Sequence, residues 1–198
     1  MWESLFRKTP PNPIENERWL FHFDAQTISF YADIAVYLAE RLDGYHTYSL
    51  LDVGPHTGSG LAILRLMHHP LTTSRIKFDP VTGVDIDPVF RSRAQQLFPD
   101  IEALEGDVFD IVDRKWDLVL SSHTIEHVKD PLKLLGKLEK LANKGVIIAC
   151  PFEEADLIEW HFSRITYKTL NDAGFSQFKT YRSNHWHNSL CIIASKWF

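Results

Sequence analysis

The chain has 198 residues, long enough for one domain with a sizeable core, and its 44% hydrophobic content is typical of a globular protein. Its net charge of −5, without a long run of like charge, argues against a nucleic-acid surface as its main partner. No apolar run approaches membrane-spanning length, the first residues lack a signal-peptide pattern, and two cysteines lie in apolar runs that predict buried free thiols. We therefore expect a cytoplasmic protein that binds neither nucleic acid nor membrane.

The pattern of apolar and turn-forming residues divides the chain into an arm and one domain. Residues 1–24 mix aromatic residues with three prolines and predict an extended N-terminal arm, and residues 25–198 are expected to form a single domain. Helical spacing predicts a first helix over about 24–42. The elements expected next are a strand over 48–53, a helix over 59–67, a loop over 68–80, a strand over 81–85, a helix over 88–98, strands over 101–104 and 116–121, a helix from 131 to a stop at Gly145, a strand over 146–150, a helix over 167–174 and strands over 178–182 and 190–195.

Strands that alternate with helices along most of this chain indicate an α/β fold. We expect a doubly wound, mostly parallel, seven-stranded sheet of the Rossmann-like type. Its last two strands would form a C-terminal antiparallel hairpin around residues 184–188. Because such sheets bind ligands beyond the carboxyl ends of their strands, the residues that follow each strand are the candidates for a functional site.

The segment LLDVGPHTGSG over residues 50–60 joins a predicted strand to a predicted helix through a glycine-containing loop. Glycine permits a positive φ and lets a ligand approach the backbone, and the helix N-terminus offers unpaired N–H groups. Two other glycine loops fit less well. A dinucleotide fingerprint would need glycine where His56 and Ser59 stand, and a phosphate-binding P-loop would need a lysine that is absent here.

This loop resembles motif I of the class I S-adenosylmethionine-dependent methyltransferases, D-x-G-x-G-x-G, with His56 in place of the middle glycine. The similarity extends over about residues 46–150, because an acidic or polar group follows each of the next three predicted strands. A second departure is the spacing. Asp85 follows Asp52 by 33 positions, against about 20 from a glycine loop to the ribose-binding acid. The additional residues fit an insertion over 68–80.

The resemblance implies a role for each matched position in binding S-adenosylmethionine. Asp85 would accept hydrogen bonds from the ribose hydroxyls, and Asp107 would bind the adenine amino group. Asp52 would act on the amino group of the methionine portion, directly or through water. Alternatively, each of these aspartates caps a helix or lies in a solvated turn. The cofactor-binding residues expected are Asp52, Gly54, Pro55, His56, Gly58, Asp85, Ile86, Asp107, Val108 and Ser121.

Residues 123–127 read H-T-I-E-H and match H-x-x-E-H, a pattern of inverted-motif zinc hydrolases. Zinc would require both imidazoles on one face of a helix and a third ligand downstream. Here the Asp130-Pro131 pair starts a new helix only three residues after His127, so no long helix can be centred on the pattern and no metal ligand is assigned. The stretch WDLVLSSHTIEHVKDP instead resembles the segment after the fourth strand of small-molecule methyltransferases.

Histidine can remove a proton from a methyl acceptor near neutral pH. The catalytic candidates are His123, which comes closest to the end of the fourth strand, followed by His127 and His161. We expect O- or N-methylation of a small molecule, such as a sugar or another metabolite. Two alternatives stay open: a degenerate methyltransferase fold that serves as a binding or assembly module, indicated by His56, and a metallohydrolase. Oligomeric state is open too.

Overall fold

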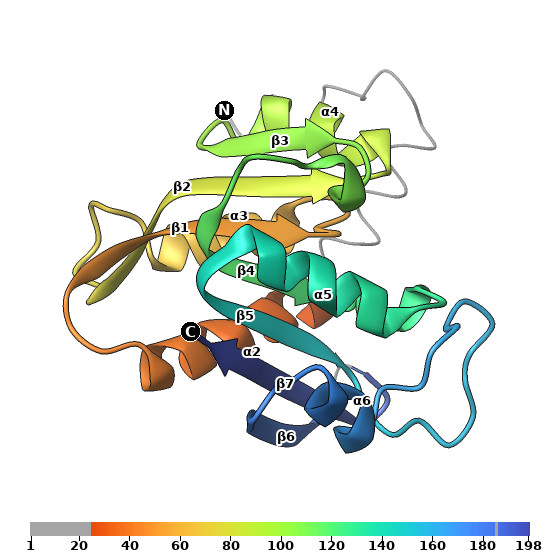
Figure 1. Cartoon of the computed structure of the whole chain (residues 1–198). Helices are drawn as coiled ribbons and strands as arrows, with labels where there is room; N and C mark the ends of the chain where they lie inside the picture. Colours follow the sequence, from red (N-terminus) through yellow and green to blue (C-terminus); the bar gives the residue numbers. More distant parts are fainter. Residues whose placement is uncertain (1–24, 185) are drawn as a thin grey trace.

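The computed structural model describes residues 25–184 and 186–198 (Figure 1). The predicted arm over residues 1–24 therefore lies outside the described residues, and the division of the chain into arm and domain stays a prediction. The elements are α2 (Ala25–Arg41), β1 (His46–Val53), α3 (Ser59–Met67), β2 (Ile76–Asp85), α4 (Pro88–Leu97), β3 (Ile101–Glu105), η1 (Val108–Asp110), β4 (Trp116–Ser122), η2 (Ile125–His127), α5 (Pro131–Leu141), β5 (Ala142–Pro151), α6 (Tyr167–Asp172), β6 (Gln177–Ser183) and β7 (Ser189–Trp197).

The strands form one seven-stranded sheet in the order β3-β2-β1-β4-β5-β7-β6. Strands β1 to β5 run parallel to one another, whereas β7 is antiparallel to both β5 and β6. The predicted fold class is confirmed, including the C-terminal hairpin. Because chain order reverses direction between β1 and β4, the crevice beyond their carboxyl ends is where a doubly wound sheet binds its ligand.

Helices cover both faces of the sheet, and each face has its own hydrophobic core (Figure 1). Helices α2, α3 and α4 pack on one face, where Ile34, Leu64 and Phe90 are completely buried. Helices α5 and α6 pack on the other face through Leu135 and Leu170. No helix among the described residues has the length and apolar character needed to cross a membrane. The two-sided cover explains why the central strands are apolar on both faces.

Side-chain caps place the helix starts where the sequence predicts them. Asp87 accepts a hydrogen bond from the Val89 backbone N–H at the start of α4, and Asp130 accepts one from Lys133 at the start of α5. A proline follows each aspartate at the first helical position, where its missing N–H costs nothing. The two Asp-Pro pairs therefore fix the first residues of α4 and α5.

Two predicted boundaries are wrong, and sheet pairing is the reason in both. Residues 68–80 are not all loop, because Ile76 begins β2 and pairs with His46 of β1. The helix that starts at Pro131 ends at Leu141 and does not reach Gly145, because Ala142 already pairs with Trp116 of β4. Backbone pairing across the sheet thus overrides the local sequence at both places.

Candidate active site

A cavity of about 630 Å³ lies at the carboxyl ends of the parallel strands. Its walls come from the segments that follow β1, β2, β3 and β4, from helix α2, from the loop between β5 and α6 and from the turn between β6 and β7. The predicted site residues that line it are Gly54, Pro55, His56, Asp85, Ile86, Asp107, Val108, His123, His127 and His161. Ten positions scattered over more than half of the chain therefore meet in one cavity.

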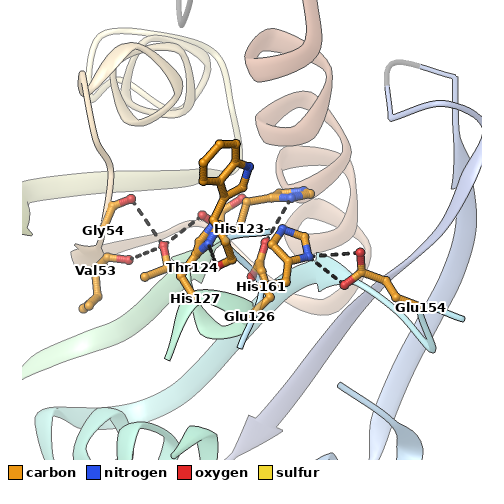
Figure 2. A network of polar contacts seen from close by, with 10 residues as sticks. Val53, Gly54, His123, Thr124, Glu126, His127, Glu154 and His161 are labelled. Carbon is orange, nitrogen blue, oxygen red and sulfur yellow. Dashed lines mark hydrogen bonds and ion pairs between the residues drawn. The ribbon is translucent and has the colours of Figure 1, made fainter. Parts of the chain in front are cut away.

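The loop after β1 keeps the course of a glycine loop although it contains a histidine. His56 adopts a φ of 51°, in the left-handed region that glycine enters freely and that histidine tolerates better than most residues. Gly54 has a φ of 79°, and a Cβ at this position would overlap the side chain of Thr124. The single hydroxyl proton of Thr124 is shared between the Val53 and Gly54 carbonyl oxygens, each 3.3 Å from Oγ1 (Figure 2). The loop is thereby held against the segment after β4.

Asp85 ends β2 and accepts hydrogen bonds from the backbone of the loop after β1 and of the segment after β2. Its Oδ2 accepts a hydrogen bond of 2.7 Å from the His56 N–H, and its Oδ1 accepts one of 2.8 Å from the Asp87 N–H. Burial raises the pKa of this carboxyl, and these backbone hydrogen bonds oppose the effect by favouring the charged form. Each carboxylate oxygen retains a lone pair for a ligand in the cavity.

Three further predicted residues follow strands β2 and β3: Ile86 follows β2, and Asp107 and Val108 follow β3. Ile86 lines the cavity and is 74% exposed, although exposure to water is unfavourable for an apolar side chain. Asp107 Oδ1 caps η1 by accepting from the Phe109 N–H, and Val108 is buried beside it. The carboxylate of Asp107 therefore serves as a local cap and also lines the cavity.

Three of the predicted cofactor residues, Asp52, Gly58 and Ser121, are not among the residues that line the cavity, and their role in cofactor binding stays a prediction. Asp52 is fully buried, its Oδ2 accepts a hydrogen bond of 2.7 Å from the Tyr31 hydroxyl, and burial raises its pKa to about 7. Gly58 starts α3 with a φ of 77°, and a Cβ there would press on Phe90. Ser121 Oγ donates to the Val53 carbonyl oxygen. These three residues therefore stabilise the segments around the cavity through hydrogen bonds and packing.

His123 occupies the end of β4 in an unusual backbone conformation. Its φ is 51°, its N–H donates to the Ala149 carbonyl oxygen, and its ring stacks on Phe30 of α2 with ring centroids 3.7 Å apart. Nδ1 lies 3.6 Å from Oε1 of Glu126, and Nε2 is buried without a hydrogen-bond partner. A nitrogen held rigidly in this way is oriented before any ligand arrives.

His127 and His161 lie next to each other, beside the carboxylate of Glu126. Their ring centroids are 4.9 Å apart, and Nδ1 of His161 binds both carboxylate oxygens of Glu154, as Figure 2 shows. Nδ1 of His127 binds the Trp160 carbonyl oxygen at 2.9 Å. The three predicted catalytic histidines therefore lie in one part of the cavity, together with Glu126.

Sequence reasoning missed several residues of this site. Phe30 and Tyr31 line the cavity from α2, and the helical spacing of α2 alone indicates only that its apolar face is buried. Trp186 stacks on His161 with an interplanar angle of 17°. Glu154 had no sequence signal. Glu126 had one, because it is the acidic residue of the H-x-x-E-H pattern.

A sheet of this strand order with a cavity at its parallel carboxyl ends defines the Rossmann-like methyltransferase fold. A family model described as a methyltransferase domain matches residues 17–183, so the chain belongs to this family. The chain is 27% identical over 154 residues to the ribosomal protein L11 methyltransferase of Clostridium botulinum (strain Eklund 17B / Type B). The match covers 75% of this chain but only 43% of that protein.

Solved structures show the same fold at low sequence identity. An S-adenosylmethionine-dependent methyltransferase from Aquifex aeolicus matches with a TM-score of 0.62 at 15% identity, over 95% of this chain and 99% of its own. The N-methyltransferase NodS from Bradyrhizobium japonicum WM9, in complex with S-adenosyl-L-homocysteine, matches with a TM-score of 0.64 at 13% identity, over 96% and 90%. These likenesses extend over nearly the whole chain and establish its architecture.

Proposed function

We propose that this methyltransferase acts on a small polar molecule, which binds at the end of the cavity where the three histidines meet. The observation that carries this proposal is a pair of unsatisfied buried atoms: His123 Nε2 and Glu126 Oε2 have no hydrogen-bond partner. Buried polar atoms without partners are costly. A polar acceptor placed here would supply the missing hydrogen bonds.

The cofactor would occupy the other part of the cavity, across the ends of β1, β2 and β3. We assign the ribose hydroxyls to Asp85, whose oxygens keep free lone pairs beside their two backbone bonds. The adenine ring would lie against the exposed Ile86 side chain, with its amino group toward Asp107. The methionine portion would run past Gly54, where a positive φ keeps the backbone open to a ligand. The residues present therefore fit this cofactor.

The order of strands in the sheet supports this arrangement. Going from β3 through β2 and β1 to β4, the cavity residues are Asp107, Asp85, the Gly54–His56 loop and His123. The acidic groups for adenosine thus lie on one side of the glycine loop, and the histidines lie on the other. Methyl transfer needs the acceptor in line with the sulfur–methyl bond, and this arrangement supports an acceptor site beyond the methionine portion.

His123 is our candidate for the group that receives the acceptor's proton. Its ring is fixed between the Phe30 ring and Glu126, and its unpaired Nε2 belongs to the cavity-lining side chain. If it acts as a base, His123→Asn should lower kcat by about 10²–10⁴-fold. Asparagine also tolerates the left-handed backbone of this position, so the substitution should leave the fold intact.

A protein acceptor is the competing possibility, because the relatives from Clostridium are named ribosomal protein L11 methyltransferases. This chain spans less than half of their length, so their substrate does not transfer to it directly. The cavity volume favours the small molecule. About 630 Å³ falls within the range of about 300–1,000 Å³ typical of pockets for drug-sized ligands. Such a volume admits the cofactor and a compact acceptor.

The test uses the intact chain with S-adenosylmethionine that carries a labelled methyl group, incubated with a cell extract divided by size. Label in the small-molecule fraction, lost in His123→Asn, is the expected result. Label in the protein fraction alone would contradict a small acceptor and support a protein one. Calorimetry that shows cofactor binding without any transfer in either fraction would favour the binding-module alternative.

A further inference from the structure

We propose that Glu126, His127 and His161 bind one divalent transition-metal ion at the acceptor end of the cavity. The ligand atoms of these three residues lie within 4.8 Å of one another. Two imidazoles and one carboxylate are the protein ligands of several zinc and iron sites that keep open positions for substrate. Bonds of about 2.0–2.2 Å would require the three ligand atoms to move closer to one another around the ion.

The hydrogen bonds of both histidines leave the nitrogen that a metal needs. The Trp160 carbonyl oxygen can only accept, so Nδ1 of His127 is the donor and Nε2 carries the free lone pair of the neutral ring. Nδ1 of His161 donates to Glu154 in the same way. Ligating histidines typically donate their other ring N–H to a carbonyl or a carboxylate, which fixes the tautomer and the ring orientation. Here His127 donates to a carbonyl oxygen and the neighbouring His161 donates to a carboxylate.

Glu126 supplies a second, independent observation. It is 1% exposed, and its Oε2 has no hydrogen-bond partner, while Oε1 lies 3.6 Å from Nδ1 of His123. A buried carboxylate is stabilised by a paired cation or by a metal ion. Among the described residues, no Lys or Arg side chain forms an ion pair with Glu126. A divalent ion between Glu126 and the two Nε2 atoms would satisfy this carboxylate.

The backbone holds the two halves of this site together. His127 belongs to η2, whereas His161 comes from the loop between β5 and α6. The Glu126 carbonyl oxygen accepts hydrogen bonds from the Phe162 N–H at 2.8 Å and from the Ser163 N–H at 3.1 Å. Trp186 stacks on the His161 ring. The ligands are therefore positioned by contacts that do not depend on the ion.

The role of the ion rests on the proposed function. A hydroxyl of the acceptor that coordinates a divalent ion becomes a stronger acid. Its proton would leave to His123 or water, the oxygen–methyl bond would form as the sulfur–methyl bond of S-adenosylmethionine breaks, and S-adenosylhomocysteine would depart as a neutral thioether. An acceptor with a hydroxyl group, rather than an amine alone, is thus the class that this site would take.

The metal ions alone are the first probes. The chelator-treated 198-residue chain is titrated separately with Zn²⁺, Mn²⁺, Co²⁺ and Mg²⁺ by calorimetry, and Co²⁺ is also followed by its visible absorption. We expect one ion per chain for Zn²⁺, Co²⁺ or Mn²⁺, and weaker binding of Mg²⁺, which prefers oxygen ligands. A Co²⁺ spectrum with nitrogen ligation would support the site without any assay of activity.

Variants then locate the site. Glu154→Ala should weaken metal affinity by about 10–100-fold, because it removes the hydrogen bond that orients His161. Glu126→Gln and His161→Ala should weaken it more, since each removes a ligand. His46→Ala is the matched control, because His46 is an exposed histidine at the start of β1, outside the cavity. Its metal affinity should equal that of the unmodified chain.

Binding of S-adenosylhomocysteine, measured on the same samples, separates this proposal from the proposed function. Retained cofactor binding in Glu126→Gln shows that a loss of metal is not a loss of the fold. If none of the four ions binds, or if Glu126→Gln and His161→Ala bind metal as tightly as His46→Ala, the metal site is wrong although the methyltransferase can stand. If metal binds but no cofactor does, the proposed function fails and the metal site survives.

Discussion

The backbone N–H of His56 donates a hydrogen bond of 2.7 Å to Oδ2 of Asp85 and so joins the loop after β1 to the end of β2. His56 itself adopts a left-handed backbone conformation, with a φ of 51°. This hydrogen bond connects His56, which departs from the family motif, with Asp85, which we propose to bind the ribose. The first two predictions follow from it.

Asp85→Asn should weaken the binding of S-adenosylhomocysteine by about 10–100-fold, because hydrogen bonds to a charged group contribute about 1.5–3 kcal/mol. The amide also has only one acceptor oxygen where the carboxylate accepts two backbone N–H groups. Calorimetry measures the change. Asp130→Asn, at the cap of α5, is the control, since asparagine caps a helix as well as aspartate does. Equal affinities for the two variants would contradict the assignment.

At His56, the backbone conformation should matter more than the side chain. His56→Val should destabilise the fold by about 1–2 kcal/mol, because a β-branched residue resists a φ of 51°. His56→Gly should keep both stability and cofactor affinity. Urea unfolding and calorimetry with S-adenosylhomocysteine provide the measurements. A glycine variant that binds cofactor while the unmodified chain does not would show that His56 blocks the site.

The stability of the fold should depend on pH through Asp52. Burial raises the pKa of this carboxyl to about 7, against an ordinary value of about 3.9 in the unfolded chain. Between these values the folded state binds more protons, so the free energy of unfolding falls as pH rises from about 4 to 7, by on the order of 4 kcal/mol.

Asp52→Asn should remove this part of the pH dependence while keeping the acceptor for the Tyr31 hydroxyl. Urea unfolding of both proteins at a series of pH values measures the difference. A free energy of unfolding that depends on pH identically in the two proteins would show that Asp52 titrates as an ordinary carboxyl.

Gly60 and Gly136 should respond oppositely to alanine. A Cβ at Gly60, in the first turn of α3, would overlap the ring of Tyr31, so Gly60→Ala should destabilise the fold by about 1–3 kcal/mol. Nothing lies within 4 Å of a Cβ at Gly136, in the interior of α5, so Gly136→Ala should stabilise it by about 0.5–1 kcal/mol. Thermal unfolding reports both signs. A Gly60→Ala variant as stable as the unmodified chain, or more stable, would refute the close approach of Tyr31 to α3.

Most of the architecture could be predicted because its causes are local. Asp-Pro pairs start α4 and α5, and apolar runs of strand length alternate with helices, so the parallel sheet and its antiparallel hairpin follow from the pattern. The wrong boundaries have a non-local cause. Pairing of Ile76 with His46, and of Ala142 with Trp116, extends two strands beyond what their own residues indicate.

Within the site, the sequence by itself determined which groups end the strands: the glycine loop, Asp85, Asp107 and the H-x-x-E-H segment lie there because every parallel strand ends at one edge of the sheet. Only the tertiary structure decided what each group touches. It buried Asp52 under Tyr31, gave His56 a glycine-like backbone and brought His161 from a distant loop to Glu126. Residues far apart in the chain meet only through packing, which short-range patterns do not record.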